Sequence, residues 1–489
     1  MIKTIQLDWD ITKGVSTLKC PADLFSHIRE EFSVPNENYR FQRRFARYTP
    51  KRLYAITPTG RFAAGLFNDI RRFVNDTYKN IEFKYSDVFL KNIKPSFEIN
   101  DLASLKLDLR DYQKDIVRQS LKIGRGVAVL ATAGGKTLTM ACLIETIYKK
   151  LPDNGSVTDF KCLVIVPTLN LVHQTSADFE DYNVSFTSCK WTGSEPLDRT
   201  ANVVVANVGI LQSSKTDIEW LKYIDILIVD EVHMLRKGNK INKLIKTILT
   251  PNKFGMTGTL PESKLDQWNI FGLIGPKLYE KNSKALRDED YIGKVITKII
   301  EIRYTTKPEK CDSPNDRYRK EIEFITRNEF RNNVIGKLTS NINNNCLIMV
   351  DYIEHGQLIY DSVLTHTPNK QVYYIKGDVD ITERERVREL MEERNDVTII
   401  AISKIFSTGI NIKNLHYIVF AGGGKAKIKI IQSIGRGLRL HKGRKELIII
   451  DITDLLTYGI KHGNQRKILY DEEEINYKIS TIKEKAKKR

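Results

Sequence analysis

Short apolar runs alternate with helix-length amphipathic stretches along most of the chain. From about residue 123 these runs read "GVAVLA", "CLVIVPT", "NVVVAN", "IDILIVDE" and "KFGMTGT", and each ends in a turn or a polar group. Strands that are apolar on both faces are typical of a parallel sheet covered on both sides. The pattern therefore predicts a parallel α/β domain over residues 101–280.

A second series of the same kind begins near residue 345, with the runs "NCLIMVD", "QVYYIKG", "VTIIAIS", "HYIVFAG" and "ELIIIDI". It predicts a second α/β domain over residues 331–460. Residues 281–330 lie between the two series and are rich in polar and charged residues, which indicates a connector or an exposed insertion. Residues 461–489 are expected to form a basic C-terminal tail.

The first 100 residues lack this alternation of strand and helix, and they predict a small α+β domain at the front of the chain. A chain of 489 residues is too long for one hydrophobic core. The predicted fold class is therefore α/β, with two parallel-sheet domains preceded by the small α+β N-terminal domain.

The charge balance changes the picture, because 78 Lys and Arg outnumber 60 Asp and Glu and leave a net charge of +18. Such an excess favours nucleic acid as partner, although a generic basic surface is the alternative. The six cysteines are scattered and form no C-x-x-C pair, so neither a zinc site nor a disulfide framework is indicated. No apolar run approaches the roughly 18 residues of a membrane span, and the amino terminus lacks a secretory pattern. A cytoplasmic protein without a membrane partner is expected.

The stretch "LATAGGKTLT" follows an apolar run and opens a predicted helix. Gly134 and Gly135 permit backbone N–H groups to converge on a phosphate, Lys136 supplies a mobile charge and Thr137 a hydroxyl ligand for Mg²⁺. The strict phosphate-loop pattern requires glycine where this chain has Leu130. A structural turn is the alternative.

A pair of carboxylates supports the nucleotide interpretation. In "ILIVDEVHML", Asp230 and Glu231 follow an apolar strand at its carboxyl end, where ligands of such sheets collect. Asp230 can hold Mg²⁺ together with Thr137, and Glu231 can orient and deprotonate an attacking water. His233 either relays the nucleotide state to neighbouring elements or packs at the strand end.

A second basic cluster lies in "QSIGRGLR". Gln432, Arg436 and Arg439 are spaced i, i+4 and i+7 and therefore share one face of a helix. Phosphoryl transfer needs a cation on the developing charge, so Arg439, with Arg436 beside it, is expected to complete the site from the second domain. Surface arginines near a basic tail are the alternative.

The sequence Asp230-Glu231-Val232-His233 resembles the DExH box of superfamily 2 helicases, and other family motifs follow in order over about residues 105–455. The resemblance implies two RecA-like domains that use ATP and Mg²⁺. In "LRDYQ", Gln113 is similar to the adenine-reading residue. The resemblance adds further nucleotide contacts at Ala133, Gly409 and Gln432. It implies nucleic-acid contacts at Thr168, Thr192, Gly193 and Thr408, each of which could instead be a helix cap.

The front domain interleaves rings with arginines in "NYRFQRRFARYTPKRLY". Arg43, Arg44 and Arg47 suit a nucleic-acid surface, and a hairpin with a solvated basic face is the alternative. This domain order resembles the phage branch-remodelling helicases of the superfamily. It implies single-stranded and branched DNA or RNA–DNA hybrids as partners, in the host cytoplasm if the chain is phage-encoded. The alternatives are an RNA helicase, a duplex translocase that does not separate strands, and a nucleotide-gated DNA clamp.

Overall fold

A computed structural model describes twelve stretches of the chain, namely residues 3–10, 14–37, 39, 49–93, 101–150, 159–213, 217–236, 238–309, 313–376, 381–403, 414–422 and 446–485. The chain divides into two compact units. The first comprises residues 1–130 and 135–281, and the second comprises residues 282–489 together with 131–134.

The front of the first unit is a small mixed sheet with helices. Its strands have the order β5-β2-β1-β6, and β1 runs antiparallel to β2 but parallel to β6. The bounds are β1 Lys3–Asp10, β2 Val15–Lys19, β5 Arg61–Phe62 and β6 Ile81–Tyr85, with α1 Ala22–Glu31, η1 Ala64–Leu66, α3 Phe67–Thr77 and α4 Asp87–Ile93. A separate hairpin pairs β3 Ser33–Pro35 with β4 Arg52–Tyr54. The predicted α+β domain is confirmed.

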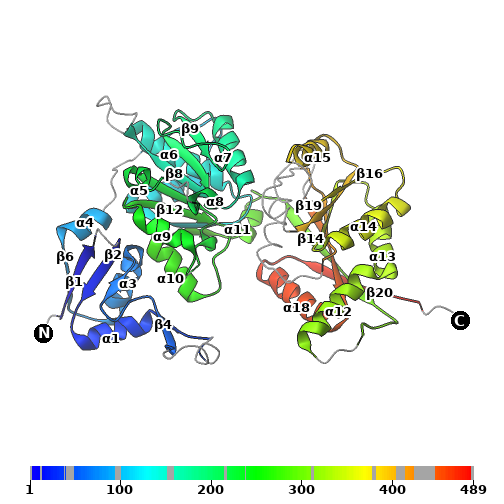
Figure 1. The fold of residues 1–489 in the computed structure, drawn as a ribbon, viewed down its shortest axis with the longest axis horizontal. Coiled ribbons are helices and arrows are strands. Elements are labelled where there is room, and N and C mark those ends of the chain that lie inside the picture. Colours follow the sequence, from blue (N-terminus) through cyan, green and yellow to red (C-terminus); the bar gives the residue numbers. More distant parts are fainter. Residues whose placement is uncertain are drawn as a thin grey trace. The chain divides into compact units, whose positions relative to one another are not determined.

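The rest of the first unit is a parallel sheet of the order β13-β7-β12-β11-β8-β10-β9 within the described residues. Figure 1 labels β8, β9 and β12 of this sheet. Its strands are β7 Arg125–Leu130, β8 Cys162–Val166, β9 Ser188–Trp191, β10 Val203–Asn207, β11 Ile226–Asp230, β12 Asn252–Thr257 and β13 Lys277–Lys281. Its helices are α5 Asp111–Ile123, α6 Lys136–Lys150, α7 Leu169–Asp181, α8 Val208–Leu211, η3 Trp220–Tyr223, η4 Val232–Met234, α9 Lys240–Thr247 and α10 Lys264–Leu273. All strand pairs are parallel, as the apolar runs predict.

Side chains of each strand alternate between two cores, because successive residues of a strand point to opposite faces. Val164 and Ile228 lie in the core with α5, α6 and α7, whereas Leu163 and Val229 lie in the core with α9 and α10. Both faces are thus covered, which explains why β8 and β11 are apolar up to the final Asp230.

The second of these cores continues into the front domain. Ile5, Leu7 and Leu18 belong to the same buried cluster as Leu163 and Val229. At the junction, Phe32 packs against Trp268 with ring centroids 5.5 Å apart. The front domain is therefore an integral part of the first unit.

The second unit contains another parallel sheet, of the order β16-β17-β15-β18-β19-β14-β20 in the part of the chain that is described. Its strands are β14 Lys294–Arg303, β15 Cys346–Val350, β16 Gln371–Ile375, β17 Val397–Ile402, β18 Tyr417–Phe420, β19 Glu446–Asp454 and β20 Tyr477–Lys483. Its helices are α11 Ser283–Asp288, α12 Pro314–Arg327, α13 Glu329–Ser340, α14 Ile353–His366, α15 Ile381–Glu393 and α18 Thr457–Glu472. Two RecA-like parallel-sheet domains are therefore confirmed.

Two predicted segments differ from the structure. The expected connector at 281–330 contains β14, which pairs with β19 and β20, and the expected tail at 461–489 contains most of α18 and the edge strand β20. Lys294 and Lys298 lie exposed on β14 beside its buried residues, and β20 is mostly exposed. A strand that has one solvent-exposed face, or that lies at the edge of a sheet, can carry charged side chains. The charged residues of β14 and β20 therefore hid their strand character in the sequence.

No described helix combines the length and the apolar character that crossing a membrane requires.

The close approach between the front domain and α10 predicts a stability effect at Gly65. A Cβ built on Gly65 would lie 1.9 Å from the backbone oxygen of Phe271, so Gly65→Ala must push the two backbones apart. We expect the variant to lose about 2 kcal/mol or more of unfolding free energy, as overpacking does. Thermal unfolding measures this. Gly193→Ala is the matched control, because its Cβ would meet no atom within 4 Å, and equal melting of both variants would contradict the shared core.

Candidate functional site

The predicted phosphate loop joins β7 to α6, and its backbone has the required curvature. Ala133 and Gly135 adopt left-handed φ values of 67° and 79°. Gly134 N–H donates to the Ala131 carbonyl at 3.0 Å, and α6 begins at Lys136. A positive φ is costly for alanine, and such strain is concentrated at functional sites. The loop therefore presents the start of a helix to an anion.

Gln113 lies on α5 and is only 2% exposed. Its amide nitrogen donates to the Gly135 carbonyl at 3.1 Å, while its amide oxygen accepts from the Arg110 N–H at 2.8 Å. Both ends of the amide thus engage backbone groups of the protein. The structure places Gln113, expected to read adenine, as a tether of the phosphate loop.

The two carboxylates follow β11 at its carboxyl end. Lys136 Nζ lies 2.5 Å from Glu231 Oε1, so the loop lysine and the proposed base form an ion pair. Glu231 has a left-handed backbone with a φ of 51°, and its N–H donates to Asp230 Oδ1 at 2.9 Å. The structure thus brings Lys136 to the adjacent pair Asp230 and Glu231, although Lys136 and Glu231 are 95 residues apart in the chain.

The two carboxyl groups have opposite electrostatics. Burial raises the pKa of Asp230 to about 6, and the neighbouring charge of Glu231 adds to this rise, whereas Lys136 opposes it. Burial also acts to raise the pKa of Glu231, but the charges and hydrogen bonds of Lys136 and His233 outweigh it and hold that pKa well below its usual range. Glu231 is therefore ionised. Burial disfavours the charged form of Asp230, and a bound cation would stabilise that form.

His233 links the carboxylates to the end of the neighbouring strand β12. Its Nδ1 lies 3.1 Å from Glu231 Oε2 and 3.0 Å from Thr257 Oγ1. Thr257 Oγ1 in turn donates to the Thr259 carbonyl at 2.8 Å. Thr257 and Thr259 are thus connected to Glu231 through His233, which favours the relay interpretation of His233 over simple packing.

Mg²⁺ takes one or two carboxylates together with phosphate oxygens and water, rather than a cage of protein ligands. Asp230 and the hydroxyl of Thr137 on the first turn of α6 fit this donor set. The described residues contain no cluster of three or more acidic, histidine or cysteine side chains that could hold a metal ion. Donors from ATP itself would therefore complete the coordination.

The predicted nucleic-acid residues of this unit lie at the same carboxyl edge of the sheet, beyond β11. Thr168 follows β8 and starts α7 without a side-chain cap bond. Thr192 follows β9 and is only 3% exposed, and its hydroxyl accepts from the N–H of Glu195 at 3.0 Å. Gly193 is exposed. Thr192 therefore shapes a turn, whereas Thr168 and Gly193 stay predicted contacts.

Eight predicted site residues lie outside the described residues, so their positions remain expectations: Arg43, Arg44, Arg47, Thr408, Gly409, Gln432, Arg436 and Arg439.

Sequence reasoning missed Arg331 on α13, which is fully buried in the second unit. Its guanidinium donates to both oxygens of Asp454 at 2.8 and 3.1 Å and to the Ala421 carbonyl at 2.7 Å. It also lies 3.0 Å from His355 Nε2. The network thus fixes Ala421, the residue that directly follows β18. A signal was present, because Arg331 stands four residues before Ile335 on the apolar face of its helix.

Comparisons with known proteins show which families this chain is similar to. Residues 106–262 match the model of the type III restriction enzyme res subunit, and residues 329–441 match that of the helicase conserved C-terminal domain. The ATP-dependent DNA helicase uvsW of Enterobacteria phage T4 is 29% identical over 507 residues, covering 95% of this chain and 97% of that protein. The DNA 3'-5' translocase XPB2 of Sulfurisphaera tokodaii is 24% identical and covers 80% of this chain and 93% of its own length.

Among solved structures, the ATP-dependent type ISP restriction-modification enzyme LlaBIII bound to DNA superposes with a TM-score of 0.57. It is 14% identical, and the match covers 85% of this chain and 34% of that chain. At this identity the likeness shows a shared fold.

The tether formed by Gln113 predicts how its loss affects nucleotide use. Gln113→Ala removes the donor to Gly135 and releases the loop, so we expect kcat/KM to fall about tenfold or more for ATP and GTP alike. Steady-state hydrolysis with both nucleotides measures this. Gln212→Ala is the control, because it removes an exposed glutamine that follows α8. A loss confined to ATP would instead assign Gln113 to adenine recognition alone.

The ion pair predicts separate phenotypes for its two members. Lys136→Ala should weaken nucleotide binding and abolish hydrolysis, whereas Glu231→Gln should retain bound ATP without turnover, because the lysine is expected to bind phosphate and the carboxylate to activate water. A fluorescent ATP analogue reports binding, and phosphate release reports turnover. Lys150→Ala, at the exposed end of the same helix, is the control. Normal turnover in either site variant would overturn the nucleotide assignment.

Proposed function

Because the chain belongs to the superfamily 2 helicases and is an ATP-dependent enzyme that acts on DNA, we propose that it remodels branched DNA such as forks, Holliday junctions and R-loops. The observation that carries this proposal is the continuous core between the front domain and the first RecA-like sheet. A DNA contact on the front domain would therefore move with the ATP-binding unit.

The reaction begins with the ion pair between Lys136 and Glu231. An incoming triphosphate competes for the lysine, since its negative charge exceeds that of one carboxylate. Glu231 is thereby released to accept a hydrogen bond from the attacking water. Mg²⁺, held by Asp230 and Thr137, would neutralise charge on the phosphates. Exchange of the lysine between two anions therefore makes the base available when ATP is bound.

Completion of the site is assigned to the second unit. Arg439, with Arg436 beside it, is proposed to stabilise the charge of the transferring phosphoryl group, and Gln432 and Gly409 to contact the nucleotide. Binding of ATP then draws the two units together, and hydrolysis releases them. Thr168, Gly193 and Thr408 are proposed to hold the strand through its phosphates, a grip that does not read sequence.

The front domain is proposed to recognise the branch point. Within its arginine-rich stretch, Arg52 is already bound to the protein, since its Nε donates to Ser33 Oγ at 2.8 Å and pairs with Glu30 at 3.1 Å. Tyr54 donates to Glu30 Oε1 at 2.8 Å. These two residues build the hairpin. Branch recognition is therefore assigned to Arg43, Arg44 and Arg47, which lie in the segment that joins β3 to β4.

One experiment tests the function as a whole. ATPase stimulation is compared between single-stranded DNA, duplex, a four-way junction and RNA, and strand displacement is followed in parallel. The proposal expects the junction to stimulate most and its arms to separate. Stronger stimulation by RNA would indicate an RNA helicase, duplex stimulation without displacement a translocase, and nucleotide-dependent binding without stimulation a clamp.

Alanine at Arg43, Arg44 and Arg47 should weaken junction binding while leaving ATPase stimulated by simple single strands nearly intact. Each lost phosphate contact should also flatten the dependence of log K on log salt by about 0.7 to 0.9. Anisotropy titrations of a labelled junction at several salt concentrations measure both effects. The control replaces Arg61, Arg71 and Arg72, which are exposed on the same domain. If the variant of Arg43, Arg44 and Arg47 binds junctions as tightly as the unmodified protein and with the same salt slope, these arginines form a solvated face.

A further inference from the structure

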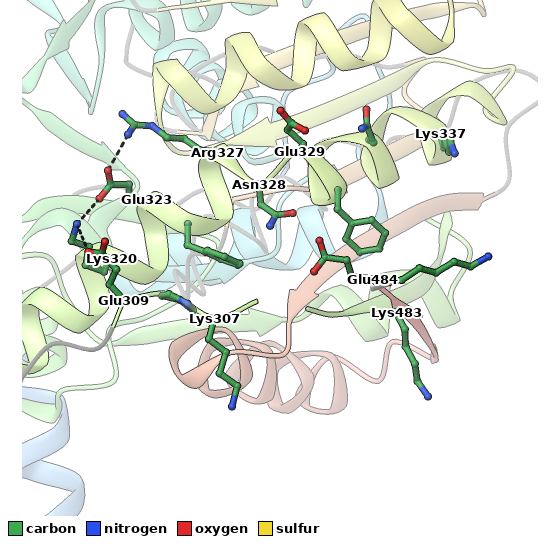
Figure 2. Close-up of a pocket in the computed structure, with 15 residues that line it drawn as sticks. Lys307, Glu309, Lys320, Glu323, Arg327, Asn328, Glu329, Lys337, Lys483 and Glu484 are labelled. Atoms are coloured by element: carbon green, nitrogen blue, oxygen red, sulfur yellow. Dashed lines mark hydrogen bonds and ion pairs between the residues drawn. The ribbon is translucent and has the colours of Figure 1, made fainter. Parts of the chain in front are cut away.

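An open groove of about 1030 Å³ lies on the second unit. It follows the carboxyl ends of β14 and β20, which lie side by side because Arg303 and Lys483 are paired in register. Helices α12 and α13 form its opposite wall (Figure 2). None of the family motifs named above contributes a residue to it.

The α12 wall of the groove is electrically balanced. Lys320 pairs with Glu309 at 3.0 Å and with Glu323 at 3.5 Å, and Arg327 pairs with Glu323 at 2.9 Å. Figure 2 shows these pairs as one row of dashed lines. On the strand side, Glu484 accepts hydrogen bonds from the backbone and the hydroxyl of Thr305, both at 2.8 Å. Three of the four acidic side chains are therefore already engaged.

The lysines of the groove are not balanced in this way. Lys307, Lys337 and Lys483 are exposed, and no ion pair joins any of them to an acidic side chain among the described residues. Lys485, also exposed, lies on the same rim. The groove therefore presents mobile positive charges on both of its walls, and these charges are available to an anionic ligand.

Two aromatic rings also line the groove. Phe324 and Phe330 line it, and both are half-buried. Phe324 is held by Tyr304 in an edge contact with centroids 5.1 Å apart. Aromatic rings and lysines in one groove match a single nucleic-acid strand, whose bases offer flat apolar faces while its phosphates require cations. An acidic peptide would satisfy the lysines but would leave the rings without a flat partner.

The groove also lies beside the start of α14, because Arg327 Nε donates to Glu354 Oε1 at 2.7 Å. Helix α14 follows β15, so its start belongs to the carboxyl edge of the second sheet. That edge is the one at which ligands of parallel sheets bind. A nucleic-acid strand bound in the groove would therefore continue along the carboxyl edge of the sheet in the second unit.

We propose that this groove binds the phosphate backbone of a single nucleic-acid strand, as an accessory track outside the helicase motifs. The proposal rests on the proposed function, since it assumes that the chain moves on DNA. Lys307, Lys337 and Lys483 contact phosphates, and Phe324 and Phe330 support bases. Contacts of this kind do not depend on base sequence.

The test changes Lys307, Lys337 and Lys483 together to glutamine in the full chain. A labelled oligothymidylate is titrated by fluorescence anisotropy over a series of salt concentrations. Loss of three phosphate contacts on a single strand should lower the slope of log K against log salt by about 2. Affinity at low salt should fall about tenfold or more. Arginine at the same three positions keeps the charge and should restore both values.

The matched control changes Lys294, Lys298 and Lys478 to glutamine. These three lysines are equally exposed on β14 and β20 but do not line the groove. The control should keep the slope of the unmodified protein. Thermal melting of all variants establishes that they are folded.

Each other outcome is decisive. A groove variant that binds like the control overturns the accessory track, while the unmodified protein still binds DNA and the proposed function stands. A groove variant that keeps DNA binding but loses binding to polyglutamate assigns the groove to an acidic peptide and overturns the proposal. Absence of salt-dependent DNA binding by the unmodified protein would instead reject the proposed function, and the track with it.

Discussion

All strands of each large sheet run in the same direction, and this constraint organises the site. In a parallel sheet every strand ends at the same edge, so the segments that follow β7, β11 and β12 are neighbours although they are far apart in sequence. The strand order places the phosphate loop on one side of the carboxylates and the segments after β8, β10 and β9 on the other. Nucleotide chemistry and the predicted nucleic-acid grip thus occupy adjoining parts of one edge.

Acidic side chains set the electrostatics of that edge. Among the described residues, the carboxylates Asp230 and Glu231 are both largely buried, and Lys136 pairs with Glu231. Burial raises the pKa of Asp230, the charge of Glu231 adds to this rise, and Lys136 only opposes it. A buried charge without full compensation is unfavourable, so a divalent cation beside Asp230 would stabilise the site. On the proposed assignment, Mg²⁺ bound with ATP would therefore compensate the negative charge of Asp230.

The second unit is stabilised by a different device. Arg331 and Arg466 are both buried, and each binds a buried aspartate of β19. Tyr470 adds a hydrogen bond to Asp451 at 2.8 Å. Removing one partner of such a pair leaves an uncompensated charge, so the pairs fix α13 and α18 on the sheet in one arrangement. Their value here is geometric, because Arg331 also binds the carbonyl at the end of β18.

The sequence alone determined the features that depend on local pattern. Apolar runs predicted the core strands, and the glycines before Lys136 predicted the loop, because backbone curvature and burial are encoded in neighbouring residues. The acidic pair after β11 was equally legible, since strand ends in such sheets are where ligands bind.

The tertiary structure decided the features that depend on residues distant in the chain. Only the fold showed that Gln113 tethers Gly135, that Lys136 pairs with Glu231 and that Thr192 shapes a turn. It also showed that β14 and β20 are strands. The sequence did not reveal this, because their polar residues face water and the strands that pair with them lie far along the chain. Periodicity records which side of an element is buried, whereas the identity of the partner across 95 residues, as for Lys136 and Glu231, is set by packing.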